Sequence, residues 1–143
     1  MATLNIYLNF LGNTEEAFNF YKSVFGGEFT TFQRFKDTPF SGQMAIEDGD
    51  KIMHISLPVG KDSVLMATDV LESMGQSLTA GNNFSISINA ESEAEADELF
   101  KKISEGGKVT MPLEKAFWGA YFGMCTDKFE IQWMVNYDYT QPS

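Results

Sequence analysis

The sequence predicts an α+β protein built from two tandem modules, each with one strand, one helix and three further strands (βαβββ). A shift of 80 residues aligns residues 5–9 with 85–89 and places Phe20 on Phe100. Both halves also share one order: an alternating segment, an amphipathic segment, a Gly-Gly pair and more alternating segments. Apolar residues at every second position indicate strands, and recurrence every three to four positions indicates a helix.

The first module is expected to cover residues 1–69, and its helix has clear start and stop signals. Asn13 is able to cap free backbone N–H groups, and the acids Glu15 and Glu16 favour a helix N-terminus. Apolar residues then recur at helical spacing until Gly26-Gly27 ends the helix. The expected strands cover 3–10, 28–35, 51–58 and 63–68, and an unassigned stretch at 36–49 ends in an Asp48-Gly49 turn.

The second module is expected at residues 84–137, between a linker at 70–83 and a short tail at 138–143. The linker contains two glycines and an Asn-Asn pair, which favour irregular structure. The expected helix covers 92–105, begins at Ser92 or Glu91 and is followed by a Gly-Gly pair. The expected strands cover 84–90, 108–112, 119–126 and 129–135.

Length and composition limit the class of protein. The 143 residues correspond to a single domain, and a net charge of −10 repels nucleic acids and anionic membranes. Cys125 is the lone cysteine, which excludes an internal disulfide and a cysteine-based zinc site. The start resembles no signal peptide, and no apolar run approaches the ~20 residues of a membrane span. We therefore expect a soluble cytoplasmic protein that binds neither nucleic acid nor membrane.

Five segments carry a resemblance to a known family: residues 15–29, 49–57, 65–69, 106–129 and 133–136. They resemble the PhnB-like branch of the glyoxalase/bleomycin resistance/dioxygenase proteins, which belong to the vicinal oxygen chelate superfamily. The resemblance implies that each sheet curves into a half-barrel, that a ligand cup lies between the half-barrels, and that the chain forms a homodimer. It implies a small-molecule ligand without naming it, because the branch is largely of unknown function.

The resemblance also implies where a metal would bind, namely on the first and last strand of each module. The matching positions are Asn5 or Ile6, Met66, Ser85 or Ile86, and Met134. None offers the imidazole or carboxylate that a hard or borderline divalent ion requires, so we expect no such metal and no cofactor. Paired methionines suit Cu(I), although they more often form an adaptable apolar wall.

Strand alternation predicts which residues would line the cup. In the first strand, Leu8 and Phe10 should face the helix, which leaves the polar side chains on the opposite face. The same count places Ile52 and Glu130 on that opposite face, which is either a cavity wall or a solvated surface. The candidate ligand-binding residues are Asn5, Tyr7, His54, Ser56, Met66, Ser85, Ser87, Gln132 and Met134. Phe117, Trp118 and Phe122 would add stacking surface, or else belong to the core or a dimer interface.

His54 is the single histidine, and three roles are open to it. It is a general base, a side chain that lines the cup, or a hydrogen-bonded structural residue. A nucleophilic role for Cys125 lacks an identifiable third group. Glu130 stands where the branch usually has glycine, so its role is open as well.

Three functions follow from these observations. The leading hypothesis is a protein that binds a small organic ligand in a cup without a metal. The alternative is an enzyme, such as a lyase, isomerase or dioxygenase, with His54 as general base and with or without a metal. The third is a structural dimer whose cup is filled by its own side chains.

Overall fold

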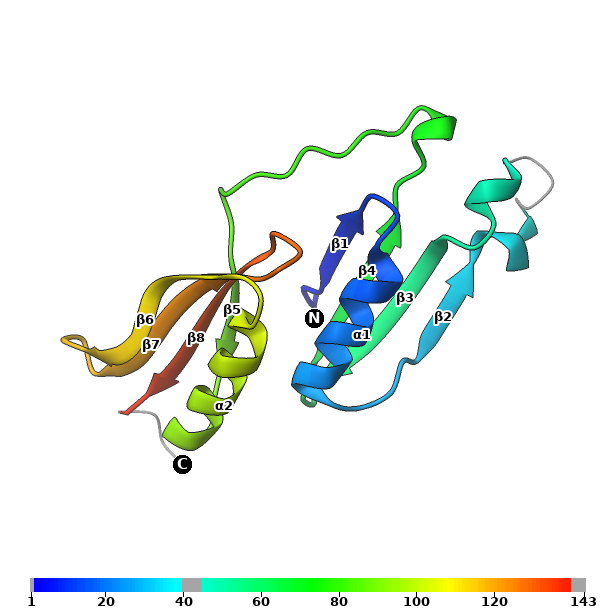
Figure 1. Ribbon diagram of the computed structural model, residues 1–143. Helices are drawn as coiled ribbons and strands as arrows, with labels where there is room; N and C mark the ends of the chain where they lie inside the picture. Colours follow the sequence, from blue (N-terminus) through cyan, green and yellow to red (C-terminus); the bar gives the residue numbers. More distant parts are fainter. Residues whose placement is uncertain (1, 40–44, 140–143) are drawn as a thin grey trace. The chain divides into compact units, whose positions relative to one another are not determined.

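The computed structural model describes residues 2–39 and 45–139 of the chain (Figure 1). The chain divides into two compact units, residues 1–79 (unit 1) and 80–143 (unit 2). Each unit holds one four-stranded sheet and one α-helix, which confirms the α+β class and the tandem modules. The boundary between the units falls inside the predicted linker. No helix in the described ranges is long and apolar enough to cross a membrane.

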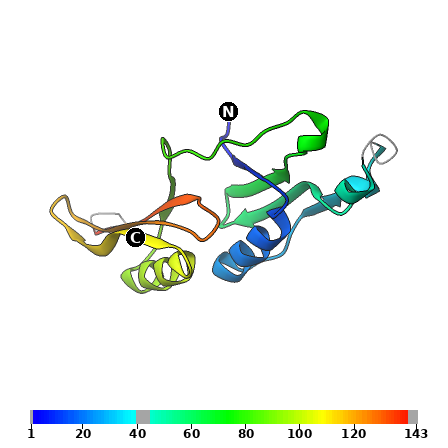
Figure 2. The ribbon, with the colours of Figure 1, turned by 45° about the horizontal axis from the view of Figure 1, so that its top comes forward.

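Unit 1 contains β1 (Ile6–Phe10), α1 (Thr14–Phe25), β2 (Thr31–Arg34), β3 (Ile52–Val59) and β4 (Ser63–Asp69), with short 3₁₀ turns at Phe35–Asp37, Ile46–Asp48 and Glu72–Met74. The strand order is β1-β4-β3-β2, with β1 parallel to β4 and the other neighbours antiparallel. α1 covers one face of this sheet (Figure 2). Leu8, Ile55 and Ala67 are buried on that face, as alternation predicts.

The N-terminus of α1 is capped by Asp69, at the end of β4. Its Oδ1 accepts hydrogen bonds from the N–H groups of Gly12 and Thr14, both at 3.0 Å, and from the Thr14 hydroxyl at 2.6 Å. Its Oδ2 accepts from the N–H of Ile52 at 2.8 Å. Asn13 occupies the N-cap position but its side chain makes no capping bond, so the predicted cap is wrong. Asp69 is 2% exposed and joins α1, β3 and β4 in one buried network.

A β-bulge in β3 changes which residue enters the core of unit 1. Alternation predicts that Ile52 shares the face of His54, yet Ile52 is only 1% exposed. The register pairs Gln33 with His54 but Arg34 with Ile52, so Met53 is an extra residue in β3. A bulge of this kind reverses the alternation beyond it, which turns Ile52 toward the core.

Unit 2 contains β5 (Ile86–Asn89), α2 (Glu93–Ser104), β6 (Lys108–Ala116), β7 (Ala120–Thr126) and β8 (Gln132–Asp138). The strand order is β5-β8-β7-β6, with β5 parallel to β8, which repeats the topology of unit 1. All eight predicted strands are present in the described residues, although β6 is longer than predicted and β8 begins later. Within the predicted stretch 36–49 and the predicted tail, residues 40–44 and 140–143 lie outside the described residues.

The internal repeat slips by one residue between the first strand and the helix. β5 has 4 residues and β1 has 5, while both strands are followed by a connection of the same length, so α2 starts one position early, at Glu93. The buried counterpart of Phe100 is therefore Tyr21, while Phe20 is only half-buried, and the predicted match of Phe20 with Phe100 is wrong. Ser92 caps α2 as predicted, because its Oγ accepts a hydrogen bond from the N–H of Glu95 at 3.0 Å.

Asp127 organises the turn between β7 and β8. Its Oδ1 accepts from the N–H groups of Phe129 at 2.7 Å and Ile131 at 3.0 Å, and its Oδ2 accepts from Trp133 Nε1 at 2.8 Å. Asp127 is 3% exposed and Trp133 is 2% exposed. Trp133 therefore lies in the core of unit 2, and Asp127 is the partner of its N–H group.

Glu130 lies in this turn and not on β8, because β8 begins at Gln132. The expectation that Glu130 lines the same face as Gln132 is therefore wrong. Its φ of 73° makes it the one non-glycine residue with a positive φ among the residues that the structure describes. A side chain with a Cβ is strained in this left-handed conformation.

Replacing Glu130 with glycine is expected to stabilise unit 2 by about 0.5 to 1 kcal/mol, because glycine adopts a positive φ without strain. Urea unfolding followed by tryptophan fluorescence measures this change, since both tryptophans, Trp118 and Trp133, lie in unit 2. Glu105→Gly is the control, because Glu105 has a φ of −60° and glycine should destabilise there. Equal destabilisation by both substitutions would contradict the strain argument.

Candidate functional site

Each sheet has one face that its own helix does not cover, and we call it the helix-free face of that unit (Figure 2). In unit 1, Tyr7 pairs with Met66, Met66 with Ser56, and Ser56 with Thr31. Residues directly opposite each other on neighbouring strands share a face, so these four form a row across the whole sheet. The helix-free face of unit 1 comprises Tyr7, Asn9, Thr31, Gln33, His54, Ser56, Val64, Met66 and Thr68.

His54 lies at the centre of a hydrogen-bonded group on this face, and we call Tyr7, His54 and Ser56 the His54 cluster. The Tyr7 hydroxyl is 3.3 Å from His54 Nδ1, and the Ser56 hydroxyl is 3.0 Å from His54 Nε2. The rings of Tyr7 and His54 are also in contact, with centroids 5.6 Å apart. Both ring nitrogens therefore have a hydroxyl partner, although Tyr7 and His54 are 47 positions apart in sequence.

The helix-free face of unit 1 carries no acid, lysine or arginine. Exposure on the face is graded, because Ser56 is 6% exposed, His54 is partly exposed and Tyr7 is 46% exposed. Hydroxyl, amide, imidazole and thioether groups without formal charge complement an uncharged ligand better than a carboxylate or phosphate.

The helix-free face of unit 2 is built in the same way. Ser87 pairs with Met134, Met134 with Met124, and Met124 with Met111. The sequence prediction included Ser87 and Met134 but missed Met111 and Met124. Met124 lies two positions after Phe122, which the sequence predicted near the cup. Strand alternation could therefore have identified Met124 as a residue of the same face. By register this face includes Ser87, Asn89, Lys108, Met111, Glu114, Phe122, Met124, Thr126, Gln132, Met134 and Asn136. Unlike the face of unit 1, it carries charged side chains, those of Lys108 and Glu114.

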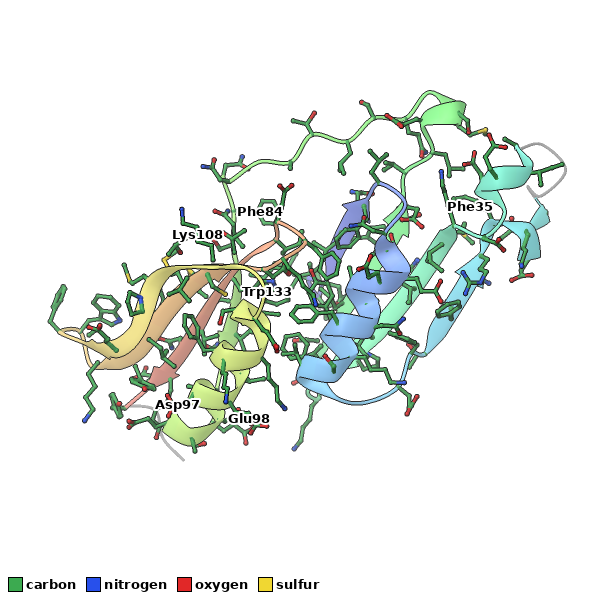
Figure 3. All side chains as sticks on the ribbon, in the orientation of Figure 1. Phe35, Phe84, Asp97, Glu98, Lys108 and Trp133 are labelled. Carbon is green, nitrogen blue, oxygen red and sulfur yellow. The ribbon has the colours of Figure 1, made fainter. Side chains whose placement is uncertain are left out.

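Other predicted site residues lie at the margins of these faces. Asn5 and Ser85 precede β1 and β5 and take no part in the ladders. The Gln132 side chain donates a hydrogen bond to the backbone carbonyl of Phe84, which places it at the end of the unit 2 sheet where Phe84 and Lys108 lie (Figure 3).

Phe117 and Trp118 form the tip of the hairpin between β6 and β7. Phe117 is 98% exposed and Trp118 is 55% exposed. Trp118 contacts Phe117 and Phe122 edge to face, with centroids 5.1 and 5.6 Å apart. The predicted aromatic surface therefore connects the hairpin tip to the helix-free face, and neither Phe117 nor Trp118 belongs to the core of unit 2.

The register also shows which side chains lie beside Met66 and Met134, two of the positions where the superfamily resemblance implies metal ligands. On β1 the partner of Met66 is Tyr7, and on β5 the partner of Met134 is Ser87. These four side chains supply two thioethers, a phenol and a hydroxyl, which do not suit a hard divalent ion. Across residues 2–39 and 45–139, no group of three or more His, Cys, Asp or Glu residues is placed to hold a metal.

Cys125 faces α2 and not the helix-free face, because it alternates with Met124 on β7. It is 2% exposed, and burial together with the nearby Asp127 raises the pKa of its thiol to about 11. A buried thiol with a raised pKa has little thiolate character at neutral pH, which does not favour a role of Cys125 as a nucleophile.

Two tyrosines of unit 2 donate hydrogen bonds to acids of α2, on the face opposite the methionines. The Tyr121 hydroxyl donates to Asp97 at 2.6 Å, and the Tyr139 hydroxyl donates to Glu93 at 2.9 Å. Asp97 projects from α2 toward the sheet side (Figure 3). The pKa of Tyr121 is raised to about 12, mainly by its hydrogen bond to Asp97. The pKa of Tyr139 is also raised to about 12, mainly by burial and next by its hydrogen bond to Glu93.

These pKa values predict that Tyr121 and Tyr139 ionise at a higher pH than ordinary tyrosines in an alkaline titration. Because their pKa values are raised on folding from about 10, their contribution to stability is complete below pH 10 and is lost as the pH rises toward 12. Absorbance near the phenolate band measures the titration. Asp97→Asn should lower the pKa of Tyr121, while Glu98→Gln, on the neighbouring residue, should leave the titration unchanged.

Two βαβββ units with this strand order define a protein of the glyoxalase fold class, and the comparisons with known proteins agree. The profile of the Glyoxalase/Bleomycin resistance protein/Dioxygenase superfamily matches residues 3–135. The chain therefore belongs to this superfamily, as the sequence resemblance predicted.

The relatives place the chain more closely. Protein PA1353 from Pseudomonas aeruginosa has a solved structure that is 40% identical, with a TM-score of 0.84 over 96% of this chain and 98% of that one. A Bacillus cereus PhnB protein, described as a putative 3-demethylubiquinone-9 3-methyltransferase, is 25% identical, with a TM-score of 0.75 over 95% and 99%. Protein YjdN of Escherichia coli is 26% identical over 98% of both chains. These likenesses confirm the resemblance to the PhnB-like branch.

Proposed function

We propose that this protein binds a small, uncharged organic molecule and that the His54 cluster forms the polar end of the binding site. The observation that carries this proposal is the pairing of both His54 nitrogens with hydroxyl groups on a sheet face without formal charge. A purely structural histidine would be expected to bond to the core, whereas His54 remains partly exposed beside the exposed Tyr7.

The His54 cluster is adaptable in its hydrogen bonding. A neutral imidazole has one N–H donor and one acceptor nitrogen, so one hydroxyl donates to the ring and the other accepts from it. Rotation of the two hydroxyls and a change of tautomer would let the cluster either donate to or accept from a ligand. Met66, which pairs with both Tyr7 and Ser56, offers a polarizable apolar contact beside these polar groups.

The wider site belongs to the proposal as well. We infer that Ser87, Phe122 and Met134, on the helix-free face of unit 2, also contact the ligand. We also infer that the chain works as a homodimer in the cytoplasm. Sedimentation equilibrium tests the dimer: a mass of twice 16.0 kDa is expected, and a monomer at micromolar concentration contradicts it.

Native mass spectrometry of the protein as purified from cells tests the ligand. The expected result is an additional mass that disappears on denaturation and is then identified as an organic molecule in the extract. His54→Leu removes both hydrogen bonds at similar volume and should weaken binding by more than about tenfold. Asp62→Asn, in the exposed turn between β3 and β4, is the matched control.

Two outcomes would contradict the proposal. Equal retention of the ligand by His54→Leu would show that the His54 cluster is not its polar end. A protein that carries no organic molecule, and whose Tyr7, His54 and Ser56 resonances do not shift with any of a panel of neutral compounds, would remove the binding function itself.

The second candidate is an enzyme in which His54 acts as a general base. The observation that favours it is the hydroxyl on each ring nitrogen, since one partner is able to orient the ring while the other is replaced by a substrate. Once a substrate is identified, turnover that survives His54→Ala would exclude this role.

A further inference from the structure

Three methionines from three neighbouring strands lie side by side on the helix-free face of unit 2, and we call them the methionine row. Met134 on β8 is the direct partner of Met124 on β7, and Met124 is the direct partner of Met111 on β6. Met111 is 44% exposed, and Met124 and Met134 are partly exposed, so all three side chains are accessible from that face. The sequence analysis considered Met134 together with Met66, which lies in unit 1.

Met111 joins this row because β6 contains bulges on both sides of it. Val109 pairs with Cys125, which faces α2, while Met111 pairs with Met124, which faces away from α2. Without an extra residue at Thr110, Val109 and Met111 would share a face, so the bulge turns Met111 onto the face of Met124. A second irregularity follows between Met111 and Glu114. Bulges next to functional sites commonly redirect one side chain in this way.

We propose that the methionine row binds a soft monovalent d¹⁰ cation, Cu(I) or its redox-inert analogue Ag(I), through the three thioether sulfurs. Thioethers select Cu(I) over hard divalent ions. Neighbouring strands are about 4.8 Å apart, and each methionine has three rotatable side-chain bonds, so the outer two sulfurs are able to converge on the one from Met124. The net charge of −10 favours a cation near the chain.

The other unit provides an internal comparison. Met66 occupies the corresponding strand of unit 1, but its two register partners are Tyr7 and Ser56. A single thioether between two hydroxyl groups does not make a soft-metal site. The cation site therefore belongs to unit 2 alone. It shares Met134 with the wider site proposed for the organic ligand but no residue with the His54 cluster.

Titration of the full chain with Ag(I) tests the proposal, with the ε-methyl groups of all eight methionines labelled with ¹³C. The titration is made in a Cys125→Ser background, because a thiol would compete for the ion. The expected result is one Ag(I) per chain and a shift of three methyl signals, those of Met111, Met124 and Met134. The signal of Met66 should stay in place.

Substitution by leucine, which conserves volume, identifies the ligands. Met124→Leu should weaken Ag(I) binding by more than about tenfold, because Met124 is the central ligand. Met74→Leu, at an exposed methionine of unit 1, is the matched control and should have no effect. Binding that is unchanged in Met124→Leu, or methyl shifts spread over other methionines, would show that the row is only an apolar wall and would overturn the proposal.

Discussion

Replacing Asp69 with alanine is expected to lower the free energy of unfolding of unit 1 by at least about 3 kcal/mol. The substitution removes a buried carboxylate that accepts four hydrogen bonds, from Gly12, Ile52 and two groups of Thr14. Three of the donors are backbone N–H groups, and buried N–H groups without a partner are costly. Loss of these four hydrogen bonds frees both the N-terminus of α1 and the start of β3.

Urea unfolding followed by far-ultraviolet circular dichroism measures this effect, and amide exchange in α1 assigns it to unit 1. Asp69→Asn should be intermediate, because its amide oxygen replaces only one of the two acceptor atoms. Asp62→Ala, in the exposed turn of the same hairpin, should change stability by less than about 0.5 kcal/mol. If Asp69→Ala lowered the free energy of unfolding no more than Asp62→Ala does, water would have to satisfy the freed donors.

Replacing Asp127 with alanine is expected to destabilise unit 2 by about 2 to 4 kcal/mol. Its carboxylate holds the N–H groups of Phe129 and Ile131 in the β7–β8 turn and accepts from the buried indole of Trp133. Without it, the indole N–H group is left in the core without this acceptor, and the turn loses the bonds that fix its shape.

Tryptophan fluorescence during urea unfolding measures the loss, since Trp118 and Trp133 both lie in unit 2. A double-mutant cycle with Trp133→Phe isolates the carboxylate–indole bond, because phenylalanine keeps the ring but lacks the N–H group. Glu105→Ala, at an exposed position of unit 2, is the control. A coupling energy near zero between Asp127 and Trp133 would contradict the role assigned to this bond.

Local pattern predicts the elements of this fold well because each module repeats short-range signals. Alternation correctly assigned Leu8 and Phe10 to the core and Tyr7 to the other face, since no irregularity interrupts β1. It failed at Ile52, where a bulge reverses the phase, and a bulge leaves no mark in composition. Met111 was missed for the same reason, because a bulge turns its side chain onto the helix-free face of unit 2.

Interactions between distant segments could not be predicted in the same way. The cap of α1 comes from Asp69, 55 positions after Thr14, while Asn13 satisfied every local rule for a cap. The contact of Tyr7 with His54 likewise depends on the order of strands in the sheet, so sequence supplied the candidates but not their grouping.

The two ways of capping α1 and α2 have a consequence for the order of folding. α2 carries its cap within its own first turn, at Ser92 and Glu95, and is able to nucleate locally. α1 gains its cap only after a loop of more than fifty residues has closed to bring Asp69 to Thr14, and closing a long loop slows folding. We therefore infer that unit 2 folds first. Stopped-flow φ-values should be high at Ser92 and low at Asp69, and the reverse order would contradict this inference.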